Sequence, residues 1–208
     1  RKSCTRRIVK GFIPNDAKWG YTAFTPKGCI SCRGTFADGY GEKFFKLPCE
    51  PRDILYVRET WERFECWNCE GDESGSCPKE PQKSVLDKVC GCYMYRATDE
   101  ISGDAKWHPS IRMSKEAARI WLKVTDVRVE RLQKITEDGC IAEGIYPSNC
   151  RGCNATFGCD ACPDEGYNEV DGFADLWNST IKKSDLDRYS WDANPWVWVI
   201  GFERCEKP

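Results

Sequence analysis

The sequence contains no run of about eighteen apolar residues, the length that a membrane-spanning helix requires, so we predict no membrane partner. It also contains a single histidine, His108. One histidine excludes any zinc site built from two histidines, and it would have to act alone as a general base. No Gly-rich phosphate loop, HExxH motif or DxD cluster is present. The sequence therefore gives no support to an NTPase or a metalloprotease.

Cysteine, by contrast, is abundant, with fifteen in 208 residues. Many of these cysteines stand in CxxC or CxC pairs, whereas secreted disulfide proteins usually carry an even number at longer spacings. No signal-peptide pattern opens the sequence. We therefore expect zinc rather than disulfides, and a cytoplasmic location. The first residue is Arg1, within a basic segment, and we expect further residues upstream of it.

Four cysteines lie within thirteen residues near position 150. Two CxxC pairs joined by a short loop make a complete tetrahedral thiolate set. Four thiolates leave no open coordination position, so we predict a structural zinc site within an insertion at residues 147–166. The expected ligands are Cys150, Cys153, Cys159 and Cys162.

A second cysteine-rich insertion is expected at residues 64–92. Four of its five cysteines would complete another zinc site, and the two outer pairs would clamp the base of the loop. The favoured ligands are Cys66, Cys69, Cys90 and Cys92, with Cys77 as the substitute. Whether Cys29, Cys32 and Cys49 bind a third zinc stays open.

Patterns typical of short β-strands dominate outside the insertions, and helical patterns are few. Strands are predicted at residues 53–61, 92–97, 120–129 and 196–205. Thr136 can cap a short helix that ends at Gly144, and a helical stripe begins near Asp171. We predict a single α+β domain over residues 1–208, mostly β: a small β-barrel with a few flanking helices.

The formal net charge of −2 conceals an uneven distribution. Residues 1–10 contain five basic side chains and no acid, whereas residues 160–175 contain six acids and no base. A basic segment attracts phosphate. A solvated charged strand explains the charge pattern equally well.

Several segments, taken in order, resemble a known family. The opening residues RKSCTRR are similar to the end of the Gly-Arg-Lys-Thr-x-Thr-x-Arg motif of ASCH domains, which belong to the PUA-like superfamily. Residues 53–61 resemble that family's Gly-Asp-x-Leu strand, with Arg52 in place of the usual glycine. Residues 106–113, 124–145 and 190–200 resemble a phage and prophage branch of the family. The resemblance implies an ASCH-type, PUA-like barrel carrying two zinc-stapled insertions.

The leading function that this resemblance implies is binding of RNA or a modified nucleoside at a basic barrel mouth. In such a pocket, basic side chains hold phosphate while an aromatic ring stacks on a base. The residues expected to bind the ligand are Arg6, Arg7, Arg58, Glu59, Trp61, Trp107 and His108.

Two alternatives remain open. Some ASCH proteins are amidohydrolases that act on N(4)-acetylcytidine, and the matching motifs place their catalytic set on Lys2, Thr5 and Glu143. Thr5 would be the nucleophile, activated by the Lys2 amine, with Glu143 holding the pair in register or protonating the departing amine. We expect Lys2 and Glu143 to line one hollow, although a plain ion pair explains them too. The other alternative is a zinc-stabilised phage protein that binds a protein partner.

Overall fold

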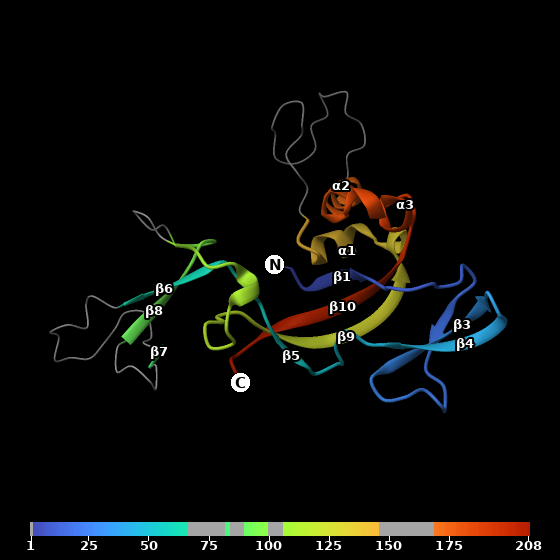
Figure 1. Cartoon of the computed structure of the whole chain (residues 1–208), viewed down its shortest axis with the longest axis horizontal. Helices are drawn as coiled ribbons and strands as arrows, with labels where there is room; N and C mark the ends of the chain where they lie inside the picture. The colour runs from blue at the N-terminus through green and yellow to red at the C-terminus, as the bar shows by residue number, and fades with distance from the viewer. Residues whose placement is uncertain (1, 66–81, 84–89, 100–105, 146–168) are drawn as a thin grey trace, which may run out of the picture. The chain divides into compact units, whose positions relative to one another are not determined.

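The computed structural model of the chain describes residues 2–65, 82–83, 90–99, 106–145 and 169–208. The chain divides into two compact units. The first comprises residues 1–53 and 123–203, and the second comprises residues 54–122 and 204–208. Strands hold more of the described residues than helices do, which confirms the predicted α+β, mostly β, class (Figure 1).

The central sheet of the first unit joins the two ends of the sequence. Strand β1 (Cys4–Ile8) pairs antiparallel with β10 (Trp196–Cys205), which lies between β1 and β9 (Trp121–Arg131). Both long strands curve, so the sheet curls (Figure 1). The strand predicted at residues 196–205 is confirmed, and the one predicted at residues 120–129 runs to Arg131.

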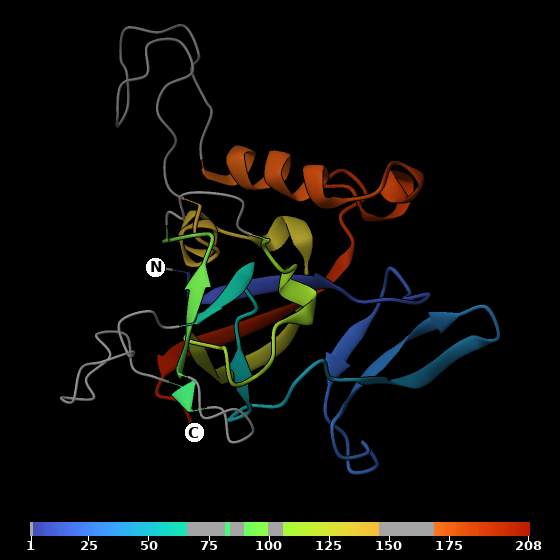
Figure 2. The same cartoon turned by 60° about the vertical axis from the view of Figure 1, so that its left-hand side comes forward.

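Helices cover one face of this sheet (Figure 2). The first is α1 (Glu137–Ala142), where the Thr136 hydroxyl accepts a hydrogen bond of 3.2 Å from the Gly139 backbone N–H. Gly144 follows with a positive φ of 90°, a conformation that favours glycine. The predicted capped helix is therefore confirmed. The second, α2 (Glu169–Thr180), begins two residues before the predicted Asp171.

The core of the first unit fills the space between these helices and the sheet. It is continuous from the sheet residues Cys4, Val197 and Val199 to Phe173 and Trp177 of α2. Apolar side chains from strands and helices are thus buried against one another. The hydrophobic effect of this burial is the main force that holds the helices on the sheet. The described part of this unit also contains short helical segments: η3 (Leu132–Lys134), η4 (Lys183–Asp185) and α3 (Leu186–Tyr189).

The first unit also contains a three-stranded antiparallel sheet that the sequence analysis did not predict. Its order is β2 (Lys18–Gly20), β3 (Cys29–Phe36) and β4 (Gly39–Lys46). One face packs through Trp19, whose ring centroid lies 5.2 Å from that of Phe45 and 5.8 Å from that of Trp196.

The second unit contains short strands. They are β5 (Ile54–Tyr56), β6 (Trp61–Glu65), β7 (Gln82–Lys83) and β8 (Cys90–Tyr95), the last three in the order β6-β8-β7. A 3-10 turn, η2 (Ser110–Arg112), follows. The single strand predicted at residues 53–61 is wrong, because the chain leaves β5 after Tyr56, and the Glu59 N–H bonds the Met113 sulfur at 3.1 Å. The strand predicted at residues 92–97 begins two residues earlier, as β8.

None of the described helices combines the length and the hydrophobicity that spanning a membrane requires.

Candidate functional site

A cluster of charged side chains forms where the N-terminal strand meets the end of α1. The Lys2 ammonium nitrogen Nζ lies 2.8 Å from Glu143 Oε2, and the Arg6 guanidinium nitrogen Nη1 lies 3.3 Å from Glu143 Oε1. The Lys2 side chain is 48% exposed, whereas the Arg6 and Glu143 side chains are only 4% and 6% exposed. One buried carboxylate therefore holds two cations, and only Lys2 is open to a ligand. We call Lys2, Arg6 and Glu143 the N-terminal charge cluster.

Backbone contacts bring Lys2 and Glu143 together across 141 positions. The Ser3 N–H donates to the Ala142 carbonyl at 2.7 Å, which ties the start of the chain to the end of α1. Glu143 is the C-cap of that helix, and Gly144 lets the chain turn away beside Lys2. A Cβ at Gly144 would lie 3.4 Å from the Lys2 Cβ, so the two segments are in close contact.

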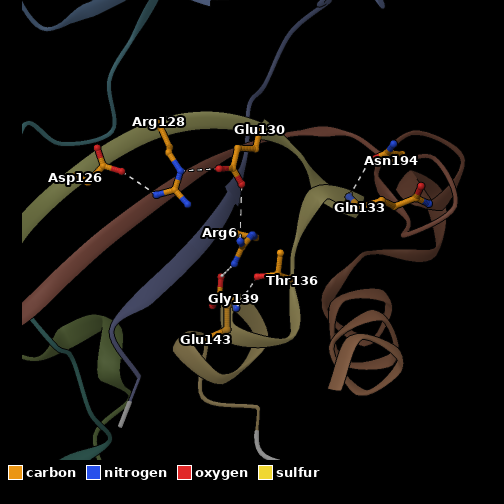
Figure 3. Close-up of polar contacts among 9 residues, drawn as sticks. All are labelled: Arg6, Asp126, Arg128, Glu130, Gln133, Thr136, Gly139, Glu143 and Asn194. Carbon is orange, nitrogen blue, oxygen red and sulfur yellow. Dashed lines mark hydrogen bonds and ion pairs between the residues drawn. The ribbon is translucent and has the colours of Figure 1, made fainter. Parts of the chain in front are cut away.

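Arg6 extends the cluster into a longer network on β9 (Figure 3). Its Nη2 nitrogen lies 3.9 Å from Glu130, which accepts a hydrogen bond of 2.6 Å from Arg128. Arg128 also bonds Asp126 at 2.8 Å. Charged groups thus alternate in sign from Asp126 to Lys2.

Glycine makes room for the buried Arg6 side chain. A Cβ at Gly139 would lie 3.3 Å from Arg6 Nη2 and 3.0 Å from Ile135. Among the described residues, the buried Arg6 Nε atom has no hydrogen-bond partner. Burying a guanidinium with one donor unpaired costs stability. A buried polar atom without a partner calls for an explanation, and a functional role is one such explanation. The cluster is therefore a candidate site.

Thr5 and Arg7 lie on the opposite face of the sheet from Arg6. Successive side chains of a strand leave on alternate faces, and β1 alternates buried Cys4 and Arg6 with more exposed Thr5 and Arg7. Within the described part of the chain, no hydrogen bond joins Thr5 to Lys2 or Glu143. The structure therefore brings Lys2 and Glu143 together and places the Thr5 side chain away from them.

The remaining predicted ligand-binding residues belong to the second unit. Arg58 donates to the Ile111 carbonyl at 3.1 Å, and Glu59 accepts two hydrogen bonds from Arg119, at 2.9 and 2.7 Å. The rings of Trp61 and His108 lie 5.2 Å apart, and His108 Nε2 lies 3.5 Å from Glu62. Trp107 is half-buried. Arg58, Trp61 and His108 thus have partners within their own unit.

Most of the predicted zinc ligands lie outside the described residues. This holds for Cys66, Cys69, Cys150, Cys153, Cys159 and Cys162, and for the alternative ligand Cys77. The backbones of Cys90 and Cys92 lie in β8, but their side chains are not among those described. Both zinc sites therefore stay predictions.

The CxxC pair at Cys29 and Cys32 adopts a geometry unsuited to a metal knuckle. Both residues lie in β3, and residues three apart on a strand point to opposite faces. Cys49 is buried as a free thiol. The described residues contain no group of three or more His, Cys, Asp or Glu side chains that could hold a metal ion.

A pocket of about 390 Å³ lies elsewhere in the first unit. Aromatic and aliphatic side chains form most of its wall, including Phe12, Tyr189 and Trp196, with Arg188 at its side. None of the predicted site residues lines this pocket.

The chain matches no protein-family model, no curated protein and no solved structure.

Sequence reasoning missed the β9 part of the network. Asp126, Arg128 and Glu130 are spaced two apart, so a strand directs all three to one face. Alternating charges at that spacing on a predicted strand are a signal that could have revealed them. Their connection to Arg6 depends on the fold, because β10 lies between β1 and β9.

Proposed function

We propose that the protein binds RNA or a modified nucleoside at the N-terminal charge cluster. The observation that carries this proposal is the half-exposed Lys2 ammonium held at 2.8 Å from the buried Glu143 carboxylate. One of its three N–H groups bonds Glu143, which leaves two donors for a phosphate or a base carbonyl. Glu143 and Arg6 are positioning residues that hold Lys2 in a fixed place.

The proposal adopts the scaffold that the sequence resemblance implies, an ASCH-type PUA-like barrel in the cytoplasm. The curled sheet of β1, β10 and β9 with helices on one face is compatible with that scaffold. Structural zinc at Cys150, Cys153, Cys159 and Cys162, and at the earlier cysteine set, belongs to the same proposal.

An amidohydrolase built on Lys2, Thr5 and Glu143 has less support. Nucleophilic catalysis requires the hydroxyl and its activating base within hydrogen-bond reach, about 2.6–3.2 Å. The Thr5 side chain leaves the sheet on the face opposite Arg6, the partner of Glu143. Binding without hydrolysis is therefore the favoured function.

Calorimetric titration with cytidine monophosphate, cytidine and N(4)-acetylcytidine tests the proposal. We expect saturable binding, tighter for the monophosphate because Lys2 contributes a cation. Lys2→Ala should weaken monophosphate binding about tenfold, the effect of losing one charge-assisted contact.

Lys134→Ala is the matched control, because Lys134 is an exposed lysine of the same unit at the end of η3. Equal affinities for wild type and Lys2→Ala would refute binding at the cluster. Release of acetate from N(4)-acetylcytidine, abolished by Thr5→Ala, would establish the enzyme instead.

A further inference from the structure

The exposed aromatic side chains of the described residues are confined to one stretch of sequence. Among the residues that the structure describes, the large aromatic residues with exposed side chains lie between positions 12 and 44: Phe12, Tyr21, Phe24, Tyr40 and Phe44. Aromatic residues normally bury their large apolar area. A concentration of exposed rings therefore needs an explanation beyond folding.

Two of these rings share one face of strand β4. Tyr40 is 70% exposed and Phe44 is 42% exposed, and four residues separate them. Side chains four apart on a strand point the same way, about 14 Å from each other. The strand register places Thr35 opposite Tyr40 and Ser31 opposite Phe44.

The same face carries cations from all three strands. Arg33 pairs with Lys18 on β2 and with Glu42 on β4, so these three side chains stand side by side. Lys46 follows Phe44 by two residues and shares its face. Lys18, Arg33 and Lys46 are exposed. We call the face that carries Lys18, Arg33, Tyr40, Phe44 and Lys46 the aromatic face.

The acids near the aromatic face already have partners. Glu42 accepts a hydrogen bond of 3.2 Å from Arg33 and another from the Ser31 hydroxyl. Asp16, at the margin, accepts from the Thr35 N–H at 3.0 Å and from its hydroxyl at 2.8 Å. The acids of the aromatic face are thus engaged, so its cations can attract an anion while its rings stay open for stacking.

The opposite face of this sheet is the one that packs. There Trp19 contacts Phe45, and the Lys43 ammonium lies 4.2 Å from the centre of the Phe36 ring. Tyr40 and Phe44 therefore do not contribute to that packing.

We propose that the aromatic face binds single-stranded RNA, with bases stacking on Tyr40 and Phe44 and phosphates contacting Lys18, Arg33 and Lys46. Aromatic rings on an open sheet, bordered by cations, are the features with which proteins hold unpaired bases and their backbone. This inference rests on the proposed RNA function and adds a second contact region to it. A protein partner fits less well, because lysine is depleted at the centre of protein interfaces.

Fluorescence anisotropy with a labelled single-stranded RNA of about twelve nucleotides, a length within the range that single-strand binders cover, tests the inference. Tyr40→Ala and Phe44→Ala should each weaken binding about tenfold, the effect of losing one stacked base. Tyr40→Phe keeps the ring and should bind like wild type. Phe12→Ala is the matched control, since Phe12 is 68% exposed and its ring contacts Phe36 on the packed side.

A second pair separates the two faces by charge. Lys46→Ala should weaken RNA binding and lower its salt dependence, whereas Lys43→Ala, on the other face of the same strand, should change neither. Wild-type RNA affinity in both Tyr40→Ala and Phe44→Ala would overturn the inference. The inference would also be overturned if these two variants changed the self-association of the protein, measured by sedimentation, and left its RNA affinity unchanged.

The two proposals fail separately. Cytidine monophosphate is expected to contact Lys2 and not the aromatic face, so Tyr40→Ala should leave its binding unchanged. RNA affinity lost in Tyr40→Ala, with cytidine monophosphate binding equal in wild type and Lys2→Ala, would support the aromatic face and refute the cluster. The reverse result would refute the aromatic face and support the cluster.

Discussion

Glu143 is the residue through which both cations of the N-terminal charge cluster are held. Its side chain is 6% exposed, and it accepts from Lys2 and Arg6 at the same time. Removing one member of a buried ion pair leaves the other charged and unpaired, which costs more than the pair itself contributes. The loss of stability on each substitution therefore depends on whether a charged partner stays buried and unpaired.

Glu143→Gln should lower the free energy of unfolding by about 3 kcal/mol, because the buried Arg6 would keep only the more distant Glu130 carboxylate, at 3.9 Å. Lys2→Gln should cost less than about 1 kcal/mol, since the lysine is half exposed and water replaces the lost contact. Denaturant unfolding of both variants measures the difference. Equal costs would contradict the buried position of Glu143.

The buried thiols give a second residue-scale prediction. Burial raises the pKa of the Cys32 and Cys140 thiols to about 11. Iodoacetamide at pH 8 should therefore label them at least tenfold more slowly in the folded chain than in urea, because the thiolate is the reactive form. Peptide mass spectrometry follows each site. Rapid labelling of Cys140 in the folded chain would contradict its place in the core.

The same shift sets a pH dependence. In the unfolded chain both thiols lose their protons near the ordinary cysteine pKa of 9.0, whereas in the folded chain they stay neutral up to a pKa of about 11. The unfolded state is therefore favoured as the pH rises between these two values. Their contribution to stability is therefore complete below pH 9 and is lost as pH approaches 11.

At the scale of elements, local sequence signals predicted some parts of the fold and missed others. The strand Trp196–Cys205 was predictable from its run of apolar and β-branched residues, and helix α1 from its Thr cap and the glycine that follows it. Each of these signals lies within a few residues of the element that it predicts. The β3–β4 hairpin was not predicted, because its strands contain glycines and charged residues rather than an alternating run of β-branched apolar residues. Its two-residue loop, Ala37-Asp38, leads into Gly39 at a φ of 111°, and Asp-Gly is a sequence typical of hairpin turns.

The proximity of Lys2 and Glu143 was predicted through the family resemblance, because residues 141 positions apart carry no local signal. The depth at which Arg6 lies was not predictable. It depends on Gly139, which leaves space for the guanidinium, and on β10 lying between β1 and β9.

Thr136→Ala should destabilise the protein by about 1 kcal/mol, because the Gly139 N–H loses its cap. Thr136→Ser keeps the hydroxyl and serves as the control. Thermal unfolding of both variants gives the comparison. A serine variant as unstable as the alanine variant would show that the hydroxyl does not stabilise α1.

At the scale of the whole molecule, metal content tests the proposed zinc sites. A chain purified without chelators should contain about two zinc ions, and Cys153→Ser should lose one of them, since a structural site needs all four ligands. Cys205→Ser, at a free thiol in β10, should lose none. Elemental analysis gives the ratio of zinc to protein in each variant. Equal zinc in wild type and Cys153→Ser would contradict a site at residues 150–162.

The most direct test follows the side chain of Arg6 by NMR in arginine-labelled protein, assigned with Arg6→Lys. Addition of cytidine monophosphate should shift the Arg6 Nε signal saturably, because the ligand contacts Lys2 and alters the charge around Glu143, which Arg6 bonds. Saturating ligand that shifts other arginine signals and leaves Arg6 unmoved would contradict binding at the N-terminal charge cluster.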